Sequence, residues 1–371
     1  MQRVPNLKAR LIAFYLPQYH PIPENDEWWG KGFTEWRNVA TARPLFWGHH
    51  QPNVPADLGF YDLRLPETRL AQAELAQSYG IEGFCYWHYW FNGKLLLERP
   101  VQEIVASGQP DFPFCLAWAN EPWSRRWHGR AQDVLQPQTY GGDEDDRRHF
   151  EWLLPALTDR RAIKVDGKPL FLVYKAKDLP NPRLTTDLWR EMASRAGLPD
   201  IFLLSIETSG SFGWDPRQGG FDGAVEFQPN WNRLMRYMKR HIYLLAKNLS
   251  LYQTLWVADY GKLWPHLISP KAGYPLYRGV CPCWDNTPRK QRRGMIFRNS
   301  SPEEYRNWLS HTVELTKNEF PDHRLIFVNA WNEWGEGNYL EPDLRYGHAY
   351  LEATLQSVQG GRFNNGFSPL P

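Results

Sequence analysis

The chain has 371 residues, of which 42% are hydrophobic and 15% aromatic, so it can bury a substantial core. Its 43 basic and 41 acidic side chains give a formal net charge of +2, which excludes the strong positive field expected of a nucleic-acid-binding protein. A mean hydropathy of −0.60, without a long apolar run, excludes a membrane-embedded body.

Eight apolar, β-rich runs recur along the chain, and segments with helical periodicity lie between them. The runs span residues 11–20, 83–90, 114–121, 170–174, 201–207, 223–228, 277–285 and 324–331. Their nearly continuous apolar character is typical of parallel strands that are covered on both faces. Helices are predicted over 66–79, 143–157, 186–196 and 301–319, the last of which opens with Ser-Pro-Glu-Glu.

This alternation predicts an α/β fold, namely a single (β/α)8 TIM barrel that forms one catalytic domain over residues 1–371. A doubly wound open sheet is the alternative. Two long insertions interrupt this alternation. Residues 21–66 follow the first run and are rich in Trp, Gly and Pro, and residues 230–275 precede the seventh run. Because the loops after the strands build the active-site face of a barrel, we expect these insertions to form walls of a substrate cleft.

The four cysteines, Cys85, Cys115, Cys281 and Cys283, fall within predicted strands, so we expect reduced core residues. Cys281 and Cys283 lack the spacing of a zinc site, and we expect neither a metal nor another cofactor. The first residues carry no apolar signal-peptide core, so a cytoplasmic protein is expected unless a targeting segment was trimmed.

The last predicted strand leads directly into Trp331-Asn332-Glu333-Trp334-Gly335-Glu336-Gly337. Cleavage of a glycosidic bond needs one carboxyl group to protonate the leaving oxygen and a second that serves as base or nucleophile, and we assign these roles to Glu333 and Glu336. Trp331 and Trp334 are expected to desolvate the pair and raise one pKa, while the two glycines permit a tight backbone. The alternative is a helix N-terminus that places acidic residues against its dipole.

Other strand ends carry side chains that suit sugar binding, because tryptophan stacks on the apolar face of a sugar ring while carboxylates and amides bond its hydroxyls. With 19 tryptophans the chain has many such positions, although core packing is the alternative for each. The predicted substrate-binding residues are Tyr15, Tyr19, His20, Trp87, His88, Tyr89, Trp118, Asn120, Glu121, Glu207, Glu226, Trp284, Asp285, Asn332 and Trp334. For Glu207, Glu226 and Asp285, the alternative is a salt bridge to Arg125, Arg126, Arg289 or Arg293.

Two runs of charged residues, 143–146 and 289–293, are interpreted as structural features and not as ligand sites of their own, except that the basic run can contact an anion. The acidic run 143–146 opens a predicted helix, where it favours the helix dipole rather than a metal ion. The basic run 289–293 has no aromatic platform around it, so we interpret it as a solvated loop or an anion contact rather than a nucleic-acid site.

The glutamate motif resembles the signature of glycoside hydrolase family 99-like proteins, including the WbsX-like proteins encoded in surface-polysaccharide gene clusters. Further similar motifs lie at 14–21, 32–36, 86–90 and 118–121. Pro122 and Ser124 depart from the run expected after Glu121, which puts the local contacts there in doubt.

The resemblance implies a barrel enzyme that acts on α-linked sugars, mannosides in the characterised members, with retention of configuration and without a metal. By position, Glu333 would deprotonate the sugar's 2-hydroxyl, which attacks C1, and Glu336 would be the general acid and then the general base. Asn120-Glu121 is also similar to the acid/base pair of another glycosidase clan, so Glu121 with Glu333 is the rival catalytic pair.

We therefore expect a glycoside hydrolase or transglycosidase whose partner is an oligo- or polysaccharide, with neither nucleic acid nor membrane insertion. The alternative is a glycosyltransferase in the biosynthesis of a polysaccharide such as O-antigen, and a third class is a lectin-like barrel without turnover. The sequence favours the first class because it has no glycine-rich phosphate loop of the usual form.

Overall fold

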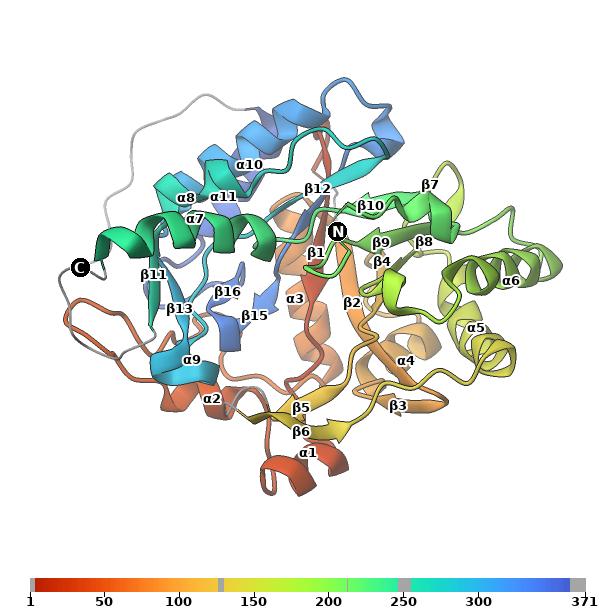
Figure 1. Ribbon diagram of the computed structural model, residues 1–371, viewed down its shortest axis with the longest axis horizontal. Helices are drawn as coiled ribbons and strands as arrows, with labels where there is room; N and C mark the ends of the chain where they lie inside the picture. Colours follow the sequence, from red (N-terminus) through yellow and green to blue (C-terminus); the bar gives the residue numbers. More distant parts are fainter. Residues whose placement is uncertain (1–3, 126–129, 212, 246–254, 361–371) are drawn as a thin grey trace.

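The computed structural model describes residues 4–125, 130–211, 213–245 and 255–360 (Figure 1). Its centre is a barrel of eight parallel strands, which run β1-β14-β12-β10-β9-β8-β4-β2 around the sheet. Strand β1 pairs with both β14 and β2, so that Ile12 lies between Phe327 and Gly83 and the sheet is closed. The barrel strands are β1 (Arg10–Tyr15), β2 (Ile81–Phe91), β4 (Phe114–Trp118), β8 (Lys168–Val173), β9 (Phe202–Ile206), β10 (Gly223–Val225), β12 (Leu276–Val280) and β14 (Leu325–Val328).

Each of the eight predicted runs overlaps one barrel strand, which confirms the (β/α)8 barrel and excludes the open sheet. Several strands end before the apolar run does, as β12 ends at Val280 although its run extends to 285. The remaining residues of each run continue as loops at the carboxyl end of the barrel. These loop residues are the ones that can reach a ligand at that face.

Helices cover the outside of the barrel (Figure 1). The described helices are α1 (Pro23–Trp29), α2 (Trp36–Thr41), α3 (Pro66–Ser78), α4 (Arg99–Ser107), α5 (Asp143–Thr158), α6 (Pro182–Arg195), α7 (Trp231–Leu245), α8 (Tyr260–Leu267), α9 (Thr287–Lys290), α10 (Pro302–Thr316) and α11 (Ala349–Gln359). All four predicted helices are confirmed as α3, α5, α6 and α10. The largest error is at α6, which begins at Pro182 because the Asn181 side chain caps it by accepting from Leu184 N.

Short additional strands lie around the eight barrel strands. They are β3 (Lys94–Leu96), β5 (Trp123–Arg125), β6 (Arg130–Gln136), β7 (Lys164–Val165), β11 (Trp256–Asp259), β13 (Met295–Arg298), β15 (Asn332–Glu333) and β16 (Asn338–Tyr339). The last two form an antiparallel pair around the glutamate motif, with Glu333 opposite Asn338. The motif therefore forms a small hairpin rather than the start of a long helix.

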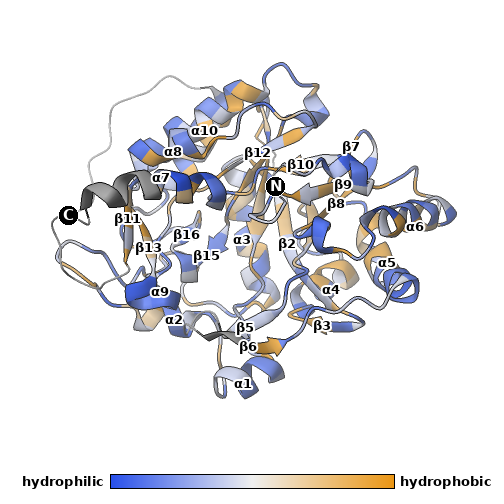
Figure 2. Cartoon of the chain, viewed as in Figure 1, coloured by the Kyte–Doolittle hydropathy of each residue, from blue (hydrophilic) through white to orange (hydrophobic). Residues whose placement is uncertain are grey.

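The barrel interior is apolar and aromatic. Phe14 stacks on Trp87 with ring centroids 5.0 Å apart, and it also contacts Phe227 and Phe327 from other sides of the barrel. Figure 2 shows largely hydrophobic barrel strands, whereas α9, which carries part of the basic run, is hydrophilic. Side chains of this size contribute about 1.5–3 kcal/mol each when fully buried, so the barrel centre is a rigid base for the loops above it.

All four cysteines are free. Cys85 and Cys115 are buried in paired barrel strands as predicted. Cys281 and Cys283 instead follow the end of β12, and Cys283 is partly exposed, which corrects their assignment to a strand. Among the described residues, no helix has both the length and the apolar character that crossing a membrane requires.

Candidate active site

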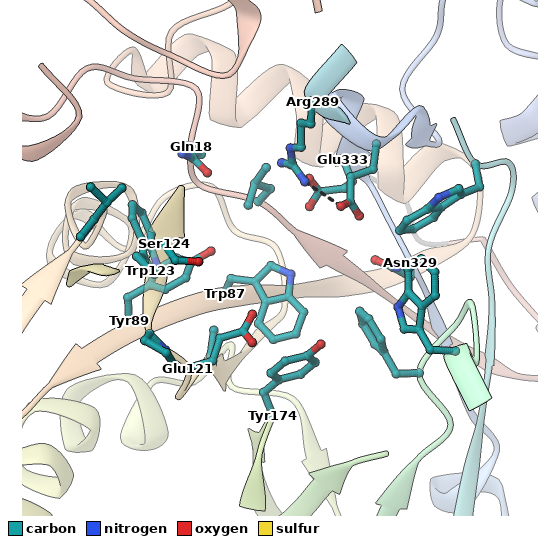
Figure 3. A pocket seen from close by; sticks show the side chains of 18 of the residues that line it. Gln18, Trp87, Tyr89, Glu121, Trp123, Ser124, Tyr174, Arg289, Asn329 and Glu333 are labelled. Carbon is teal, nitrogen blue, oxygen red and sulfur yellow. Dashed lines mark hydrogen bonds and ion pairs between the residues drawn. The ribbon is translucent and has the colours of Figure 1, made fainter. Parts of the chain in front are cut away.

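A cavity of about 260 Å³ opens at the carboxyl ends of the barrel strands (Figure 3). Loops after six of the eight strands, the end of β2 itself and segments of both long insertions contribute to its walls. The lining residues are Leu16, Gln18, Trp29, Trp87, Tyr89, Ala119, Glu121, Pro122, Trp123, Ser124, Leu135, Tyr174, Phe227, Trp231, Trp284, Arg289, Asn329, Glu333 and Glu336. The cavity thus combines an aromatic wall with a few charged groups, which is the composition expected of a sugar site.

Three carboxylates surround the guanidinium of Arg289. Its Nη2 lies 2.5 Å from Glu333 Oε1, its Nη1 lies 3.0 Å from Glu336 Oε1, and its Nε donates to Glu35 Oε1 at 2.9 Å. Arg289 and Glu35 are buried, whereas the Glu336 side chain is 24% exposed and faces the cavity. We call these four residues the Arg289 cluster.

One positive charge cannot neutralise three negative ones, so a proton is held more tightly within the cluster. Burial raises the pKa of Glu333 to about 8; Arg289 opposes this rise, and Glu336 and Glu35 add to it. Although burial disfavours its charge, the carboxylates around Arg289 raise its pKa well above the ordinary value. The expectation that one motif glutamate has a raised pKa is confirmed, and it is Glu333.

Close packing explains the two glycines of the motif. A Cβ on Gly335 would lie 2.1 Å from Glu35 Oε1 and 2.8 Å from Arg289 Nε. Gly337 has a φ of +55°, and its Cβ would lie 2.8 Å from the carbonyl oxygen of Asp285. The first glycine therefore gives the Arg289 cluster its space, and the second allows the chain to turn beside Asp285.

Asn332 and Trp334, predicted to bind substrate, instead hold the motif in place. Asn332 donates to Leu16 O at 3.1 Å and accepts from Leu16 N at 2.8 Å, so it bridges the ends of β14 and β1. Trp334 is fully buried, stacks on Tyr339 at 3.7 Å and donates to Glu341 at 2.6 Å. Neither side chain lines the cavity, which corrects both assignments.

Tyr19 also holds the glutamate motif in position. Its hydroxyl donates to Asn332 O at 2.9 Å and accepts from Trp334 N at 3.1 Å, and the side chain is fully buried. Trp331 is likewise buried within the core. Tyr19 is therefore a positioning residue in this structure and not a sugar contact.

Four of the predicted substrate-binding residues do line the cavity: Trp87, Tyr89, Glu121 and Trp284. Glu121 lies across the cavity from Glu333 in Figure 3 and forms an ion pair with Lys175 at 3.2 Å. Because Glu121 lies outside the Arg289 cluster, the geometry groups Glu333 with Glu336 rather than with Glu121.

Five predicted side chains at the first three strand ends lie outside the cavity. Tyr15 donates to Gln72 on α3, and His88 stacks on Trp152 of α5. The others are His20, which is buried, Trp118, which donates to Trp90 O, and Asn120, which bonds Lys175 and Tyr140. All five side chains are buried and none lines the cavity, so their assignment as substrate contacts is corrected.

The remaining acidic predictions have internal partners. Glu207 accepts from the Tyr274 hydroxyl at 2.7 Å, and Glu226 accepts from Ser269 N and lies 3.5 Å from Arg278. Burial raises the pKa of both carboxyls. Asp285 borders a second cavity. Of the four arginines considered as salt-bridge partners, Arg126 and the Arg125 side chain lie outside the described residues, and Arg289 is the one that pairs with the motif.

Sequence reasoning missed two members of the Arg289 cluster. Arg289 belongs to the basic run interpreted as a solvated loop or anion contact; its side chain is only 6% exposed and its anions are the protein's own carboxylates. Glu35 comes from the first insertion, in a motif noted only for its family resemblance. The acidic run 143–146 does open α5, as predicted.

A model of the family described as Glycosyltransferase WbsX matches residues 11–354. Two curated relatives, each an uncharacterized protein WxcX from a strain of Xanthomonas campestris pv. campestris, are 46% identical over 361 and 354 residues. These matches cover 95% of this chain but 50% of each relative, so the chain spans about half the length of these proteins.

Solved structures with similar folds include a GH99 endo-alpha-mannosidase from Bacteroides thetaiotaomicron, with a TM-score of 0.54 and 14% identity over 95% of this chain and 97% of that one. A glycoside hydrolase-like protein matches with a TM-score of 0.57 and 11% identity over 97% and 96% of the two chains. At these identities the similarity shows the barrel fold. The expected resemblance to WbsX-like proteins is thus confirmed, and the similarity to the GH99 structure extends to the fold.

Proposed function

The chain belongs to the WbsX family, and from this premise we propose that it is a glycoside hydrolase with Glu333 and Glu336 as its working carboxylates. The observation that carries the proposal is the Arg289 cluster, in which both glutamates are held on one buried guanidinium at the edge of an aromatic cavity. A pair of carboxyl groups in a shared electrostatic environment is what glycosidic cleavage requires.

The two glutamates differ in a way that supports a division of roles. Glu333 is buried and has a raised pKa, so its ionised form is a stronger base than an exposed carboxylate. Glu336 is more exposed to the cavity, where it can exchange a proton with a leaving oxygen and later with water. We therefore assign Glu333 as the base and Glu336 as the acid/base.

The proposed reaction follows the mechanism that the family resemblance implies. Glu333 removes the proton from the sugar's 2-hydroxyl, O2 forms a bond to C1, and the bond from C1 to the leaving oxygen breaks as Glu336 protonates that oxygen. Glu336 then removes a proton from water, the water oxygen bonds to C1, and the bond between C1 and O2 breaks as Glu333 returns its proton to O2. Two inversions at C1 give retention of configuration.

We propose α-linked oligo- or polysaccharides as the substrate class, either mannoside-like or of the surface-polysaccharide type. The aromatic wall supports a sugar ligand, because Trp87, Tyr89 and Trp284 line the same cavity as the two glutamates. The α-linkage and the participation of the 2-hydroxyl rest on the family resemblance.

A glycosyltransferase is the second candidate, because the matching family carries that description. The charges in the cavity favour the hydrolase. The described charged residues that line it are Glu121, Glu333, Glu336 and Arg289, and the single arginine is already paired with carboxylates. A nucleotide diphosphate would meet a mainly acidic wall, which repels it.

The test compares defined α-linked oligosaccharides with nucleotide sugars plus acceptors. We expect release of reducing ends without a nucleotide, with the product anomer retained when it is followed by NMR. Glu333→Gln and Glu336→Gln should each lower kcat by at least about a hundredfold, since each removes a proton-transfer group. The matched control is Glu314→Gln, which alters an exposed glutamate of α10 and should leave kcat unchanged.

Two outcomes would overturn the assignment. Transfer that depends on a nucleotide sugar and persists in Glu333→Gln would support the glycosyltransferase instead. A large loss of kcat in Glu121→Gln together with an active Glu336→Gln variant would replace the proposed pair with the rival one.

A further inference from the structure

A second cavity of about 360 Å³ lies next to the first. Its walls come from the loop 46–53, the end of β13 with the following turn, and the segment that follows Gly337. Trp284 lines both cavities. The second cavity is therefore continuous with the wall of the candidate active site.

The partition between the two cavities is thin. Asp285 N donates to Glu336 O at 2.7 Å, and this bond joins the two segments of the partition. Glu336 lines the first cavity, whereas the next residue, Gly337, lines the second. A ligand that contacts Gly337 in the second cavity would thus touch the residue next to Glu336, the proposed acid/base.

An aromatic platform borders this second cavity. Trp47 is 100% exposed, and its neighbour Phe46, at 38%, stacks on the His49 ring with centroids 4.9 Å apart. A fully exposed indole costs free energy unless a ligand covers it, and the flat apolar face of a sugar ring is a suitable cover. The platform lies where a glycan chain leaving the active site could stack.

The two aspartates of the second cavity are already occupied. Asp285 accepts from His49, Gln51, Thr287 N and the Thr287 hydroxyl. Asp343 accepts from the Tyr339 hydroxyl and from two backbone amides. His49 accepts from Leu45 N through Nδ1, so its Nε2 is the nitrogen that donates to Asp285.

The two arginines, in contrast, have no acidic partner among the residues that the structure describes. Arg298 and Arg345 both line the cavity and are exposed, and the Arg345 guanidinium carbon lies 4.8 Å above the Tyr346 ring. A guanidinium above an aromatic ring still has N–H donors available, and these match the oxygen atoms of a carboxylate or phosphate. The charge available to a ligand here is therefore positive.

We propose that this second cavity binds an acidic unit of the glycan substrate, with Arg298 and Arg345 contacting its carboxylate or phosphate and Trp47 stacking on its sugar ring. The inference rests on the proposed function, because it identifies the substrate of that function as a glycan with acidic sugar units. It also extends the binding surface beyond the catalytic cavity, so that at least one sugar unit is recognised away from the bond that is cleaved.

The test measures equilibrium binding to the full chain carrying Glu336→Gln, so that the probes are not consumed. Two matched pairs of probes are used: an α-linked oligogalacturonide with its methyl ester, and a phosphorylated oligomannoside with its unphosphorylated form. We expect at least one acidic probe to bind about tenfold more tightly than its neutral partner. The combined change Arg298→Gln and Arg345→Gln should remove this preference, whereas Arg195→Gln, an exposed arginine of α6, should preserve it.

Trp47→Ala provides an independent arm and should weaken the binding of the acidic and neutral probes alike. Equal affinity for acidic and neutral probes, or a preference that survives the double arginine change, would overturn the inference. Hydrolysis of neutral glycans without acidic preference would leave the proposed function intact. Arginine-dependent acidic binding without hydrolysis would instead count against the proposed function alone.

Discussion

Glu333 is buried beside Arg289, Glu336 and Glu35, and its burial first, then these charges, determine how it titrates. If Glu333 acts as a base, its ionised form is the active one, and burial raises its pKa to about 8. The fraction of Glu333 that can act as a base therefore rises with pH through about 8, and this gives its contribution to kcat an ascending limb. Glu35 contributes to the raised pKa although it does not line the cavity.

Changing Glu35 to glutamine tests this coupling. The glutamine oxygen can still accept from Arg289 Nε, but one negative charge is lost, so the pKa of Glu333 falls and the ascending limb of kcat against pH moves to lower pH. The measurement is a full pH profile of kcat for both proteins. A uniform loss of kcat with an unmoved limb would mean that Glu35 serves only to fold the loop.

Gly335→Ala tests the close packing of the same cluster. The added methyl would lie 2.1 Å from Glu35 Oε1, so the cluster must shift. We expect a loss of about 1–3 kcal/mol in the free energy of unfolding and a fall in kcat of at least about tenfold. Gly273→Ala is the control, because nothing lies within 4 Å of its added Cβ. Unchanged kcat in Gly335→Ala would contradict the proposed role of the cluster geometry.

At the scale of elements, the strands were predictable because their apolar runs are long and unbroken, whereas the direction of each side chain was missed. Successive residues of a strand face opposite sides. Phe14 and Trp87 meet inside the barrel, so their neighbours Tyr15 and His88 face the helices. Applying this alternation would have removed several strand-end residues from the predicted site.

Residues that join separate elements were harder to predict. Arg289 lies on a four-residue helix and Glu35 precedes another short helix, and neither has a periodic pattern that fixes its partner. The ion pair between Arg289 and Glu35 joins residues 254 positions apart in the sequence. The glutamate motif was found because both of its carboxylates follow one apolar strand.

Glu341 joins the motif hairpin to the first insertion and α3. Its carboxylate accepts from Trp334 Nε1, Tyr61 and Gln72 at 2.6–2.9 Å. All three partners donate a hydrogen bond to Glu341. In Glu341→Gln the new NH2 group would therefore face another donor instead of accepting from it. We expect this variant to lose about 1–3 kcal/mol in the free energy of unfolding, measured by chemical denaturation.

The free energy of unfolding that Glu341→Gln loses should depend on pH. Burial raises the folded-state pKa of Glu341 to about 7, above the value of an unfolded glutamate. Its contribution is then fully present below about pH 4.3 and is lost as pH rises through about 7, so the difference between wild type and Glu341→Gln should shrink over that range. Glu314→Gln, exposed on α10, should show no such trend. A difference that grows with pH would refute the assigned titration.

For the whole molecule, closure of the barrel brings loops from distant parts of the sequence to one face. The insertions also reach the cavity, since Trp29 comes from the first and Trp231 from the second. This outcome agrees with the expectation that the insertions form cleft walls. A ligand that contacts loops after many strands must therefore stabilise the closed barrel as a unit.

Thermal unfolding of Glu336→Gln in the presence of an oligosaccharide that wild type cleaves measures this linkage. At one hundred times Kd, binding to the folded state alone adds about 2.7 kcal/mol, which should raise Tm by several degrees. Trp231→Ala removes an aromatic wall from one insertion and should reduce the shift, whereas Phe320→Ala, exposed outside the cavity, should keep it. Because the shift depends on ligand contacts with the wall, an equal shift in Trp231→Ala would show that the second insertion does not bind the glycan.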